Sequence, residues 1–288
     1  MKVLTPNIKP QWNAIIVDIL REFIKICEEN HLTYFCAGGT VLGAVRHQGI
    51  IPWDDDIDVN MPRPDYDQFL KICEKRDMGD YEVVSPSNNK DYPLLFSKLC
   101  NRKTILIEAT DVPCVIGLYI DIFPLDGTAD DIDEAFYIMK RFQKIKNRIA
   151  AISTHVTFWN YMKYLLQPHE WGRFVYKTIG FLCRKSYRSY LLKKLDAISY
   201  KYNYNDAKNV ILYSGGYARR DIYPKKWFDD QTMLPFEGID IKVPAHYDEY
   251  LHQLYDDYMQ LPPIEERGLR HPKAYFNLER RERLEDIT

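Results

Sequence analysis

The sequence lacks the cysteine patterns that indicate a metal finger or a disulfide framework. Its six cysteines are scattered, with no C-x-x-C pair and no spacing typical of zinc ligands. Several lie in apolar runs, such as 24–27 and 34–36. We therefore expect buried, reduced thiols and a reducing compartment.

Long hydrophobic runs are also missing. The amino-terminal segment has no apolar core of a signal peptide, and polar residues recur too often elsewhere for a membrane-spanning helix. There is no internal repeat and no low-complexity tract. Together with 46% hydrophobic and 14% aromatic residues, these absences predict a folded, cytoplasmic protein.

Net charge is small, at −2, but it is unevenly distributed. Residues 140–201 contain fourteen Lys or Arg against two acids, which leaves about +12 there and about −14 elsewhere. One interpretation is an ordinary solvated helical face. The other is a surface that attracts an anionic partner such as a membrane, a phosphorylated glycan or nucleic acid.

Hydrophobic periodicity predicts an α+β fold. Helices are expected at 10–30, 41–47 and 64–75, and strands at 33–37, 57–61, 81–84, 94–100, 104–108 and 115–123, with a turn at 124–127. Residues 130–205 are helical, aromatic and basic, with a break near Pro168, and a helix is expected at 245–260. We expect three parts: a core at 1–129, an inserted helical subdomain at 130–205, and a carboxyl-terminal part at 206–288.

A glycine turn precedes an acidic strand. Gly38 and Gly39 open a helix, where backbone amides can point at a phosphate. Asp56 and Asp58 follow in a strand, on one face and about 7 Å apart. Two such carboxylates repel each other unless a cation lies between them. Since all ligands are oxygens, Mg²⁺ is the expected ion, with Mn²⁺ as the alternative.

Further acids extend this pattern. Asp54 and Asp55 either belong to the site or form an exposed acidic turn, and Asp54 shares the phase of Asp56. Asp121 stands alone among large apolar residues. If its strand lies beside that of Asp58, three acids could hold two ions about 4 Å apart, and Asp121 would be a candidate base. The alternative is an Asp121 paired with a Lys or Arg.

These motifs together resemble the nucleotidyltransferase superfamily. The segment AGGTVLGAVRHQGIIPWDDDIDVNMPRPDY resembles more narrowly the LicD family of phosphocholine transferases, to which fukutin-related proteins are distantly similar. Other similar stretches are 96–98, 117–127, 233–251 and 256–263, followed by Arg267 and His271. One departure is Asp256, which stands where the family pattern has glycine.

The resemblance implies a nucleotidyltransferase-like mixed sheet flanked by helices, with 130–205 as the inserted basic subdomain and 206–288 completing the active-site face. It implies transfer of phosphocholine, or another phospho-alcohol, from a CDP-activated donor to a sugar hydroxyl, with release of CMP. The acceptor would belong to a teichoic acid, lipopolysaccharide or capsule. Nucleic acid is not an implied partner. A lipid-linked acceptor would bring the basic helices to the inner face of the membrane as a peripheral contact.

The resemblance also suggests site roles. The metal ligands would be Asp56, Asp58 and Asp121. Lys98 would join Asp58 and Asp121 in catalysis by neutralising charge on the transferred phosphoryl group. The candidate donor-binding residues are Gly38, Gly39, Thr40, Arg46, His47, Arg267 and His271.

Several of these residues also have a purely structural explanation. Arg46 and His47 are as well explained by a loop salt bridge to the acidic run, and Arg267 and His271 by a solvated tail. Three aromatic residues could stack on cytosine or enclose a quaternary ammonium, unless they are core residues: Trp53, Tyr213 and Tyr217.

Three other functions compete with the phosphotransferase. A nucleotidyltransferase proper would add a nucleotide to a small acceptor and release pyrophosphate. A glycosyltransferase would also use Asp-x-Asp, but it needs a long nucleotide-binding half upstream for which the chain has no room. A nucleotide-binding module without chemistry is disfavoured because all three acids are present.

Overall fold

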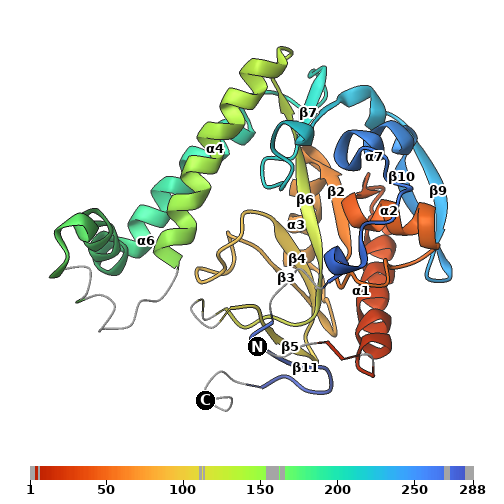
Figure 1. The fold of residues 1–288 in the computed structure, drawn as a ribbon, viewed down its shortest axis with the longest axis horizontal. Coiled ribbons are helices and arrows are strands. Elements are labelled where there is room, and N and C mark those ends of the chain that lie inside the picture. Colours follow the sequence, from red (N-terminus) through yellow and green to blue (C-terminus); the bar gives the residue numbers. More distant parts are fainter. Residues whose placement is uncertain are drawn as a thin grey trace.

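A seven-stranded mixed sheet organises the computed structural model, which describes residues 4–5, 7–109, 112, 114–153, 162, 166–268 and 273–282 (Figure 1). The strands of its main path lie in the order β1 (Phe35–Cys36), β2 (Asp58–Pro62), β6 (Tyr119–Thr128), β4 (Ser97–Asn101) and β3 (Tyr81–Val84). The pair β2–β6 is parallel and the other pairs are antiparallel. The predicted α+β class is confirmed.

Strand β6 is the longest strand and the centre of the sheet. Its first half lies between β2 and β4, and its second half pairs with β7 (Asn209–Ile211), which in turn pairs with β8 (Ile222–Pro224). Two small sheets complete the strands: the hairpin β9 (Gln231–Phe236) with β10 (Ile239–Pro244), and β5 (Ile105–Ile107) with β11 (Tyr275–Asn277).

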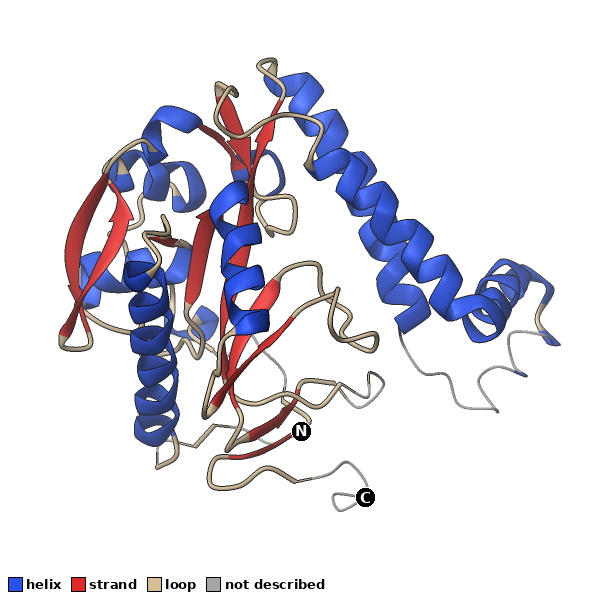
Figure 2. Cartoon of the chain, turned by 180° about the vertical axis from the view of Figure 1, so that it is seen from behind, coloured by secondary structure: helices blue, strands red, loops and turns tan. Residues whose placement is uncertain are grey.

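Helices α1 (Lys9–Glu29) and α3 (Arg63–Lys75) pack against this sheet (Figure 2). Apolar residues recur along α1 at helical spacing, and its Phe23 contacts Phe69 of α3 with 5.3 Å between ring centroids. Helices α2 (Gly38–His47) and α7 (Tyr247–Tyr255) contact each other, and α7 also packs on β10. These contacts bring the amino-terminal glycine segment against the carboxyl-terminal part of the chain.

Two long helices extend away from the sheet as a helical arm (Figures 1 and 2). They are α4 (Ile132–Ser153) and α6 (Trp171–Ser199), and the short helix η1 (Pro168–Glu170) precedes α6. The break expected at Pro168 is therefore confirmed. At the base of the arm, buried Phe142 and Leu195 pack with Ile211 and Ile222 of β7 and β8. The separate folding of 130–205 stays a prediction.

Most predicted elements of the core are present, but the predicted turn at 124–127 is wrong. Residues 124–127 continue β6, where Pro124 pairs with Met61 and Gly127 pairs with Val210. The glycine serves close packing here, because a Cβ on Gly127 would lie 2.9 Å from the carbonyl oxygen of Asn203. Helix α2 begins at Gly38, earlier than predicted, and α7 is shorter than the predicted helix at 245–260.

The cysteines behave as the sequence predicts. The five thiols that the structure describes are free and buried: Cys27, Cys36, Cys73, Cys100 and Cys114. Burial raises the pKa of each of these thiols, to about 11 for Cys114 and to about 12 for Cys73. They are therefore protonated core residues.

A buried ion pair links α3 to β6. The Arg63 guanidinium donates two hydrogen bonds to the Asp126 carboxylate, at 2.6 and 2.9 Å. It also lies 5.1 Å from the ring centroids of both Tyr66 and Tyr200. Burial raises the pKa of Asp126, and the Arg63 charge opposes that rise. Each partner thus depends on the other to remain charged in the interior.

We expect Arg63→Met to destabilise the fold by about 3–5 kcal/mol, because Asp126 would be left buried without a counter-charge. Urea unfolding at neutral pH measures this loss. Arg21→Met removes an exposed pair with Asp18 and should cost less than about 1 kcal/mol. A similar loss in both variants would show that the buried pair has no special role.

Candidate active site

Three carboxylates meet where β2 and β6 run side by side. Asp58 lies directly opposite Asp121 in the parallel register, and Asp56 precedes Asp58 by two residues. One oxygen from each of the three lies within 4.8 Å of the others. The predicted convergence of Asp56, Asp58 and Asp121 is therefore present in the structure.

Backbone hydrogen bonds fix the positions of these acids. The Asp121 amide donates to the carbonyl of Ile57 at 2.9 Å, and the Asp58 amide donates to the Thr40 hydroxyl at 2.9 Å. The Ala37 amide donates to the Asp58 carbonyl, also at 2.9 Å. Neither carboxylate can move away from the other without breaking this strand pairing.

The electrostatics of the cluster favour a bound cation. Burial raises the pKa of Asp58 well above its ordinary value, and the charges of Asp56, Asp121 and Asp54 raise it further. The charge of Lys98 opposes the rise but does not cancel it. Three ionised carboxylates at this spacing are stable only if a further positive charge lies among them.

Lys98 lies on the other side of Asp121. It pairs with Asp121 across β4 and β6, and its buried ammonium donates to Asp121 Oδ1 at 2.7 Å. Glu108 Oε1 lies 3.4 Å from the same nitrogen, which also sits 3.1 Å from the centroid of the Tyr119 ring. Burial lowers the pKa of Lys98, but Asp121 and Glu108 outweigh it and the net pKa is raised. The predicted alternative of an Asp121–Lys pair thus coexists with the three-acid cluster.

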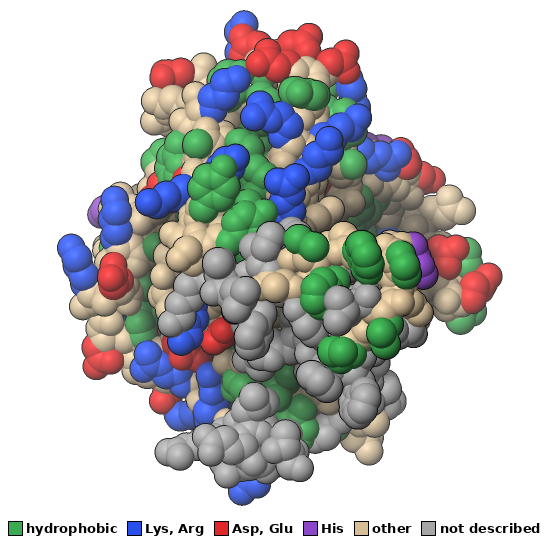
Figure 3. Space-filling model, turned by 90° about the vertical axis from the view of Figure 1, so that its left-hand side faces the viewer, with side chains coloured by type: hydrophobic (Ala, Val, Ile, Leu, Met, Phe, Trp, Pro, Cys, Tyr) green, Lys and Arg blue, Asp and Glu red, His purple; other side chains and the backbone are tan. Residues whose placement is uncertain are grey.

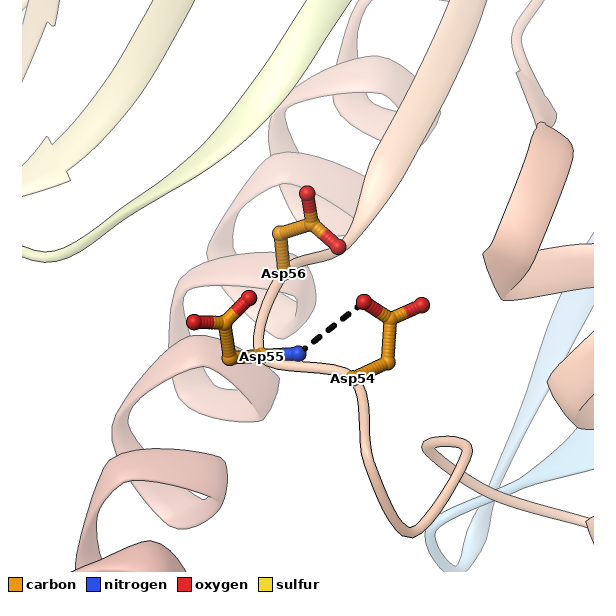
Figure 4. A group of neighbouring side chains, drawn as sticks. All are labelled: Asp54, Asp55 and Asp56. Carbon is orange, nitrogen blue, oxygen red and sulfur yellow. Dashed lines mark hydrogen bonds between the residues drawn. The ribbon is translucent and has the colours of Figure 1, made fainter. Parts of the chain in front are cut away.

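Asp54, Asp55 and Asp56 point in different directions (Figure 4). The Asp55 carboxylate pairs with buried Lys273, and the Trp12 indole donates to the Asp55 carbonyl at 2.8 Å. Asp54 and Asp56 instead line the cleft described below. Asp54, Asp55 and Asp56 also bring oxygens within 4.8 Å of one another, but Asp55 is neutralised by Lys273. Of the two extra acids, Asp54 is the one that lines the cleft, although β2 begins only at Asp58 and the strand phase expected for Asp54 is absent.

The glycine pair gives the acids room. Gly38 has a φ of +50°, and a Cβ there would lie 3.5 Å from both Asp58 Oδ2 and the Tyr255 hydroxyl. A Cβ on Gly39 would approach Asp54 Oδ2 to 2.8 Å. The Gly38 amide donates to the Tyr250 hydroxyl at 2.9 Å, so it is occupied by a protein partner. The left-handed φ of +50°, more than a close approach or a free amide, explains the glycine at 38.

A cleft of about 890 Å³ opens over the three acids. Its walls combine the acids with Lys98, the glycine pair, Arg46, Trp53 and a group of tyrosines that includes Tyr217, Tyr255 and Tyr258. Such a volume is typical of a site for a small, extended ligand.

The predicted donor-binding residues do not all reach the cleft. Gly38, Gly39 and Arg46 line it. Thr40 is buried, and its hydroxyl is engaged by the Asp58 amide, so it positions Asp58. His47 accepts a hydrogen bond from Arg46 Nε at 3.0 Å and is not among the residues that line the cleft. His271 lies outside the described residues.

Arg46 and Arg267 both approach Trp53. Their guanidinium carbons lie 5.8 and 5.1 Å from the indole centroid. Burial, together with the nearby Arg267 charge, lowers the pKa of Arg46. Among the described residues neither arginine forms an ion pair with a carboxylate, so the alternative of a salt bridge from Arg46 to the acidic run is wrong. Arg267 lines an adjoining pocket that shares Trp53 with the cleft. Two unneutralised cations at one aromatic ring favour an anionic ligand.

The aromatic candidates separate into two kinds. Tyr213 is buried and stacks on Phe142 of α4, with 4.8 Å between centroids, so the alternative of a core residue is confirmed for it. Tyr217 is exposed at the cleft and meets Tyr255 edge-to-face at 5.4 Å. The two tyrosines face ligand space together.

Sequence reasoning missed several residues of the cleft. Asn60 follows Asp58 by two residues on the same strand face, is buried, and has no hydrogen-bond partner among the described residues for either amide atom. The i+2 alternation could have indicated it. Glu108, Tyr250 and Tyr255 come from elements far away in the sequence, and no local signal marked them.

Comparison with known proteins agrees with this geometry. Residues 31–174, half of the chain, match the family described as LicD/FKTN/FKRP, nucleotidyltransferase domain. The chain belongs to this family. The resemblance stated from the sequence is confirmed, and the matched segment contains the glycine pair, the three acids and Lys98.

A relative extends the similarity beyond that segment. The lipopolysaccharide cholinephosphotransferase LicD of Haemophilus influenzae is 28% identical over 284 residues, which cover 96% of this chain and 100% of the relative. Shorter matches at 34% identity, to uncharacterized proteins of Rickettsia typhi and Rickettsia prowazekii, cover 27% and 24% of this chain and 24% and 26% of those proteins. The arm and the carboxyl-terminal tyrosines thus lie within a chain-length match to a LicD protein.

A buried acid shapes the cleft wall of this LicD-family chain. Asp221 accepts a hydrogen bond from the Tyr217 amide at 2.7 Å and one from the Tyr223 hydroxyl at 3.3 Å. A Cβ on Gly215 would lie 2.5 Å from its carboxylate. On the outer side, Lys146 of α4 donates to the Ser214 carbonyl at 3.1 Å. Asp221 therefore holds the loop 214–217 that carries Tyr217.

We expect Asp221→Asn to flatten the pH dependence of stability between about pH 4 and pH 6. Burial raises the pKa of Asp221 from 3.8 to about 6, so the folded carboxyl binds a proton more tightly than the unfolded one. The free energy of unfolding therefore falls as pH rises through this window. Above it, the variant should be more stable than wild type by up to about 3 kcal/mol, since asparagine keeps an acceptor for Tyr217.

Urea unfolding at a series of pH values measures this effect. Asp206→Asn, at an exposed position, should leave the profile unchanged. A lower stability of Asp221→Asn at pH 7.5 would mean that the charged carboxylate is needed by the loop.

Proposed function

We propose that this chain transfers phosphocholine, or a closely related phospho-alcohol, from a CDP-activated donor to a sugar hydroxyl of lipopolysaccharide or a similar surface glycan. The observation that carries the proposal is the convergence of three acids beside a glycine turn, with Asp58 and Asp121 opposite each other on adjacent strands and Asp56 just before β2. It occurs in a LicD-family chain whose full-length relative is named a lipopolysaccharide cholinephosphotransferase.

Asp56, Asp58 and Asp121 would hold Mg²⁺, with Mn²⁺ as the alternative. The residues fit such an ion, because three carboxylate oxygens converge within 4.8 Å and the raised pKa of Asp58 reports uncompensated negative charge. When bound, the ion would polarise the donor's phosphoryl oxygens and offset their charge. Lys98, in contact with Asp121, favours the ionised form of that ligand.

The reaction forms a bond from the acceptor oxygen to the phosphorus that carries the alcohol. The bond that breaks joins this phosphorus to the bridging oxygen, which leaves on CMP, and the acceptor gives up its hydroxyl proton. Asp121 and Asp56 are the candidate groups to receive that proton, since both carboxylates face the cleft. The contact with Lys98 makes Asp121 the weaker base of the two.

The cleft walls suit the two ends of such a donor. Arg46 and Arg267 are cations without carboxylate partners among the described residues, and they suit phosphate oxygens. Tyr217 and Tyr255 present an aromatic edge and face to the cleft. A trimethylammonium group donates no hydrogen bond, so aromatic rings are its natural contact. The buried amide of Asn60 complements neutral polar groups, such as those of a nucleobase or ribose.

Asp58→Asn should abolish metal binding and lower turnover by at least about 100-fold. Thermal unfolding with and without Mg²⁺ or Mn²⁺ gives a reading that does not depend on activity. The wild type should gain stability from the ion, whereas the variant should not. Without metal the variant should be at least as stable as wild type, because one of the mutually repelling charges is gone.

Asp240→Asn, on the exposed side of β10, is the matched control and should keep the full metal response. A metal-induced stabilisation of Asp58→Asn equal to that of wild type would refute the assignment of the three acids.

The alternative reaction is nucleotide transfer to a sugar or small molecule. Incubation with CDP-choline, an acceptor glycan and Mg²⁺ should release CMP, and CTP in its place should release no pyrophosphate. Product mass spectrometry should show the acceptor heavier by one phosphocholine. Pyrophosphate release from CTP, with a nucleotide on the acceptor, would establish the alternative.

A further inference from the structure

Part of the positive charge on the helical arm has no carboxylate partner among the residues that the structure describes. Between residues 135 and 195 the sequence has a single acid, Glu170. Five exposed basic side chains of α4 and α6 form no ion pair with any carboxylate that the structure describes: Lys140, Arg141, Lys144, Lys193 and Lys194. By contrast, exposed Lys103 and Lys208 on the body of the protein pair with Asp80 and Asp130. The arm is therefore complementary to an extended anionic surface.

The far end of the arm exposes large apolar side chains. Leu166 is 76% exposed, Trp171 57% and Val175 55%. Trp171 and Val175 are four residues apart on α6 and thus share one face. Figure 3 views this side of the molecule and shows Lys and Arg side chains spread over its upper part, with exposed apolar side chains below them. Leu166 and Val175 belong to neither of the two hydrophobic clusters that the described residues form.

The arm is also long enough to separate its tip from the cleft. The 29 residues of α6 span about 43 Å at the rise of an α-helix. Among the described residues, no helix combines the length and apolarity that a membrane crossing requires. A tryptophan and aliphatic residues beside lysines are typical of helices that lie at a lipid–water interface.

We propose that the helical arm docks peripherally on a bilayer rich in anionic lipid. The apolar tip, defined by Leu166, Trp171 and Val175, enters the headgroup region, and the basic faces of α4 and α6 lie against the phosphates. This binding needs neither the three acids nor a donor nucleotide, so it stands independently of the proposed reaction. It would bring the cleft to a lipid-anchored acceptor if that reaction is correct.

Vesicle flotation of the full chain tests the docking. Vesicles of phosphatidylcholine alone are compared with vesicles containing about 30% phosphatidylglycerol, at low and at high salt. The wild type should bind the anionic vesicles at least about ten-fold more strongly and lose this preference as salt rises. Equal binding to both vesicles, or none, would overturn the proposal.

Two sets of variants separate the apolar from the electrostatic part. Each set should weaken binding to the anionic vesicles by at least about ten-fold. The tip variant is Trp171→Ser with Val175→Ser, and the charge variant combines Lys140→Gln, Lys144→Gln, Lys193→Gln and Lys194→Gln.

Matched controls change equally exposed residues on the body of the protein. Binding should be unchanged in Met233→Ser with Ile264→Ser, and in Lys103→Gln with Lys208→Gln. A loss in these controls as large as in the arm variants would also overturn the proposal. Circular dichroism and thermal unfolding verify that every variant folds.

Further measurements distinguish other binding partners of the arm. A dimer in light scattering that the tip variant disperses, without vesicle binding, would make the tip a contact between two copies. Binding of duplex DNA with higher affinity than anionic vesicles would assign the charge to nucleic acid. Release of CMP with a lipid-free acceptor should be equal in the arm variants and the wild type. Vesicle binding and CMP release therefore report separately on the docking and on the reaction.

Discussion

The parallel pairing of β2 with β6 places Asp58 directly beside Asp121, and much of the surrounding structure follows from the repulsion between them. Strand spacing fixes the two backbones within about 5 Å, so the carboxylates cannot separate by sliding. The chain places a buried cation, Lys98, on the far side of Asp121, and the glycine at 39 leaves room for the neighbouring Asp54. Because the negative charge of the cluster is only partly compensated, a divalent cation would stabilise it.

Two other buried carboxylates in the same molecule each have a cationic partner. Asp126 has a bidentate arginine, and Asp55 has Lys273. Both pairs join segments that are far apart in the sequence. Since full pairing is evidently available to this chain, the incomplete pairing of Asp58 marks a binding site and not a defect of packing.

Patterns in the sequence predicted those features of the structure that depend on residues close together in the chain. The period of α1, the strand that carries Asp58 and the break at Pro168 all depend on residues that are close together in the sequence. Asp56, which was expected in the same strand, lies just before its first residue. The expectation for Asp121 was conditional on strand order, because an isolated acid does not reveal its neighbour. The register of β2 on β6 supplies that missing information.

The errors arose where distant contacts override local preference. The sequence predicted a turn at Pro124 and Gly127, but β7 pairs with this segment, which therefore continues as part of strand β6. For Tyr213 the sequence left a ligand contact and a core position open, and the contact with Phe142 of the arm decides for the core. The Tyr250 hydroxyl reaches Gly38 across 212 residues, and nothing local to either residue announces the contact.

The arm and the cleft are connected through the base of α4. Gln143 donates a hydrogen bond to the Tyr213 carbonyl at 2.7 Å, and Lys146 donates one to the Ser214 carbonyl. These bonds hold α4 against the loop 214–217, whose Tyr217 lines the cleft. Burial lowers the pKa of Lys146, and Asp221 across the loop opposes that effect. A helix that projects from the protein at one end thus forms part of the cleft wall at the other. Because α4 also packs on α6 and on β8, the described part of the arm is joined to the loop of Tyr217 by packed helices and by these two hydrogen bonds.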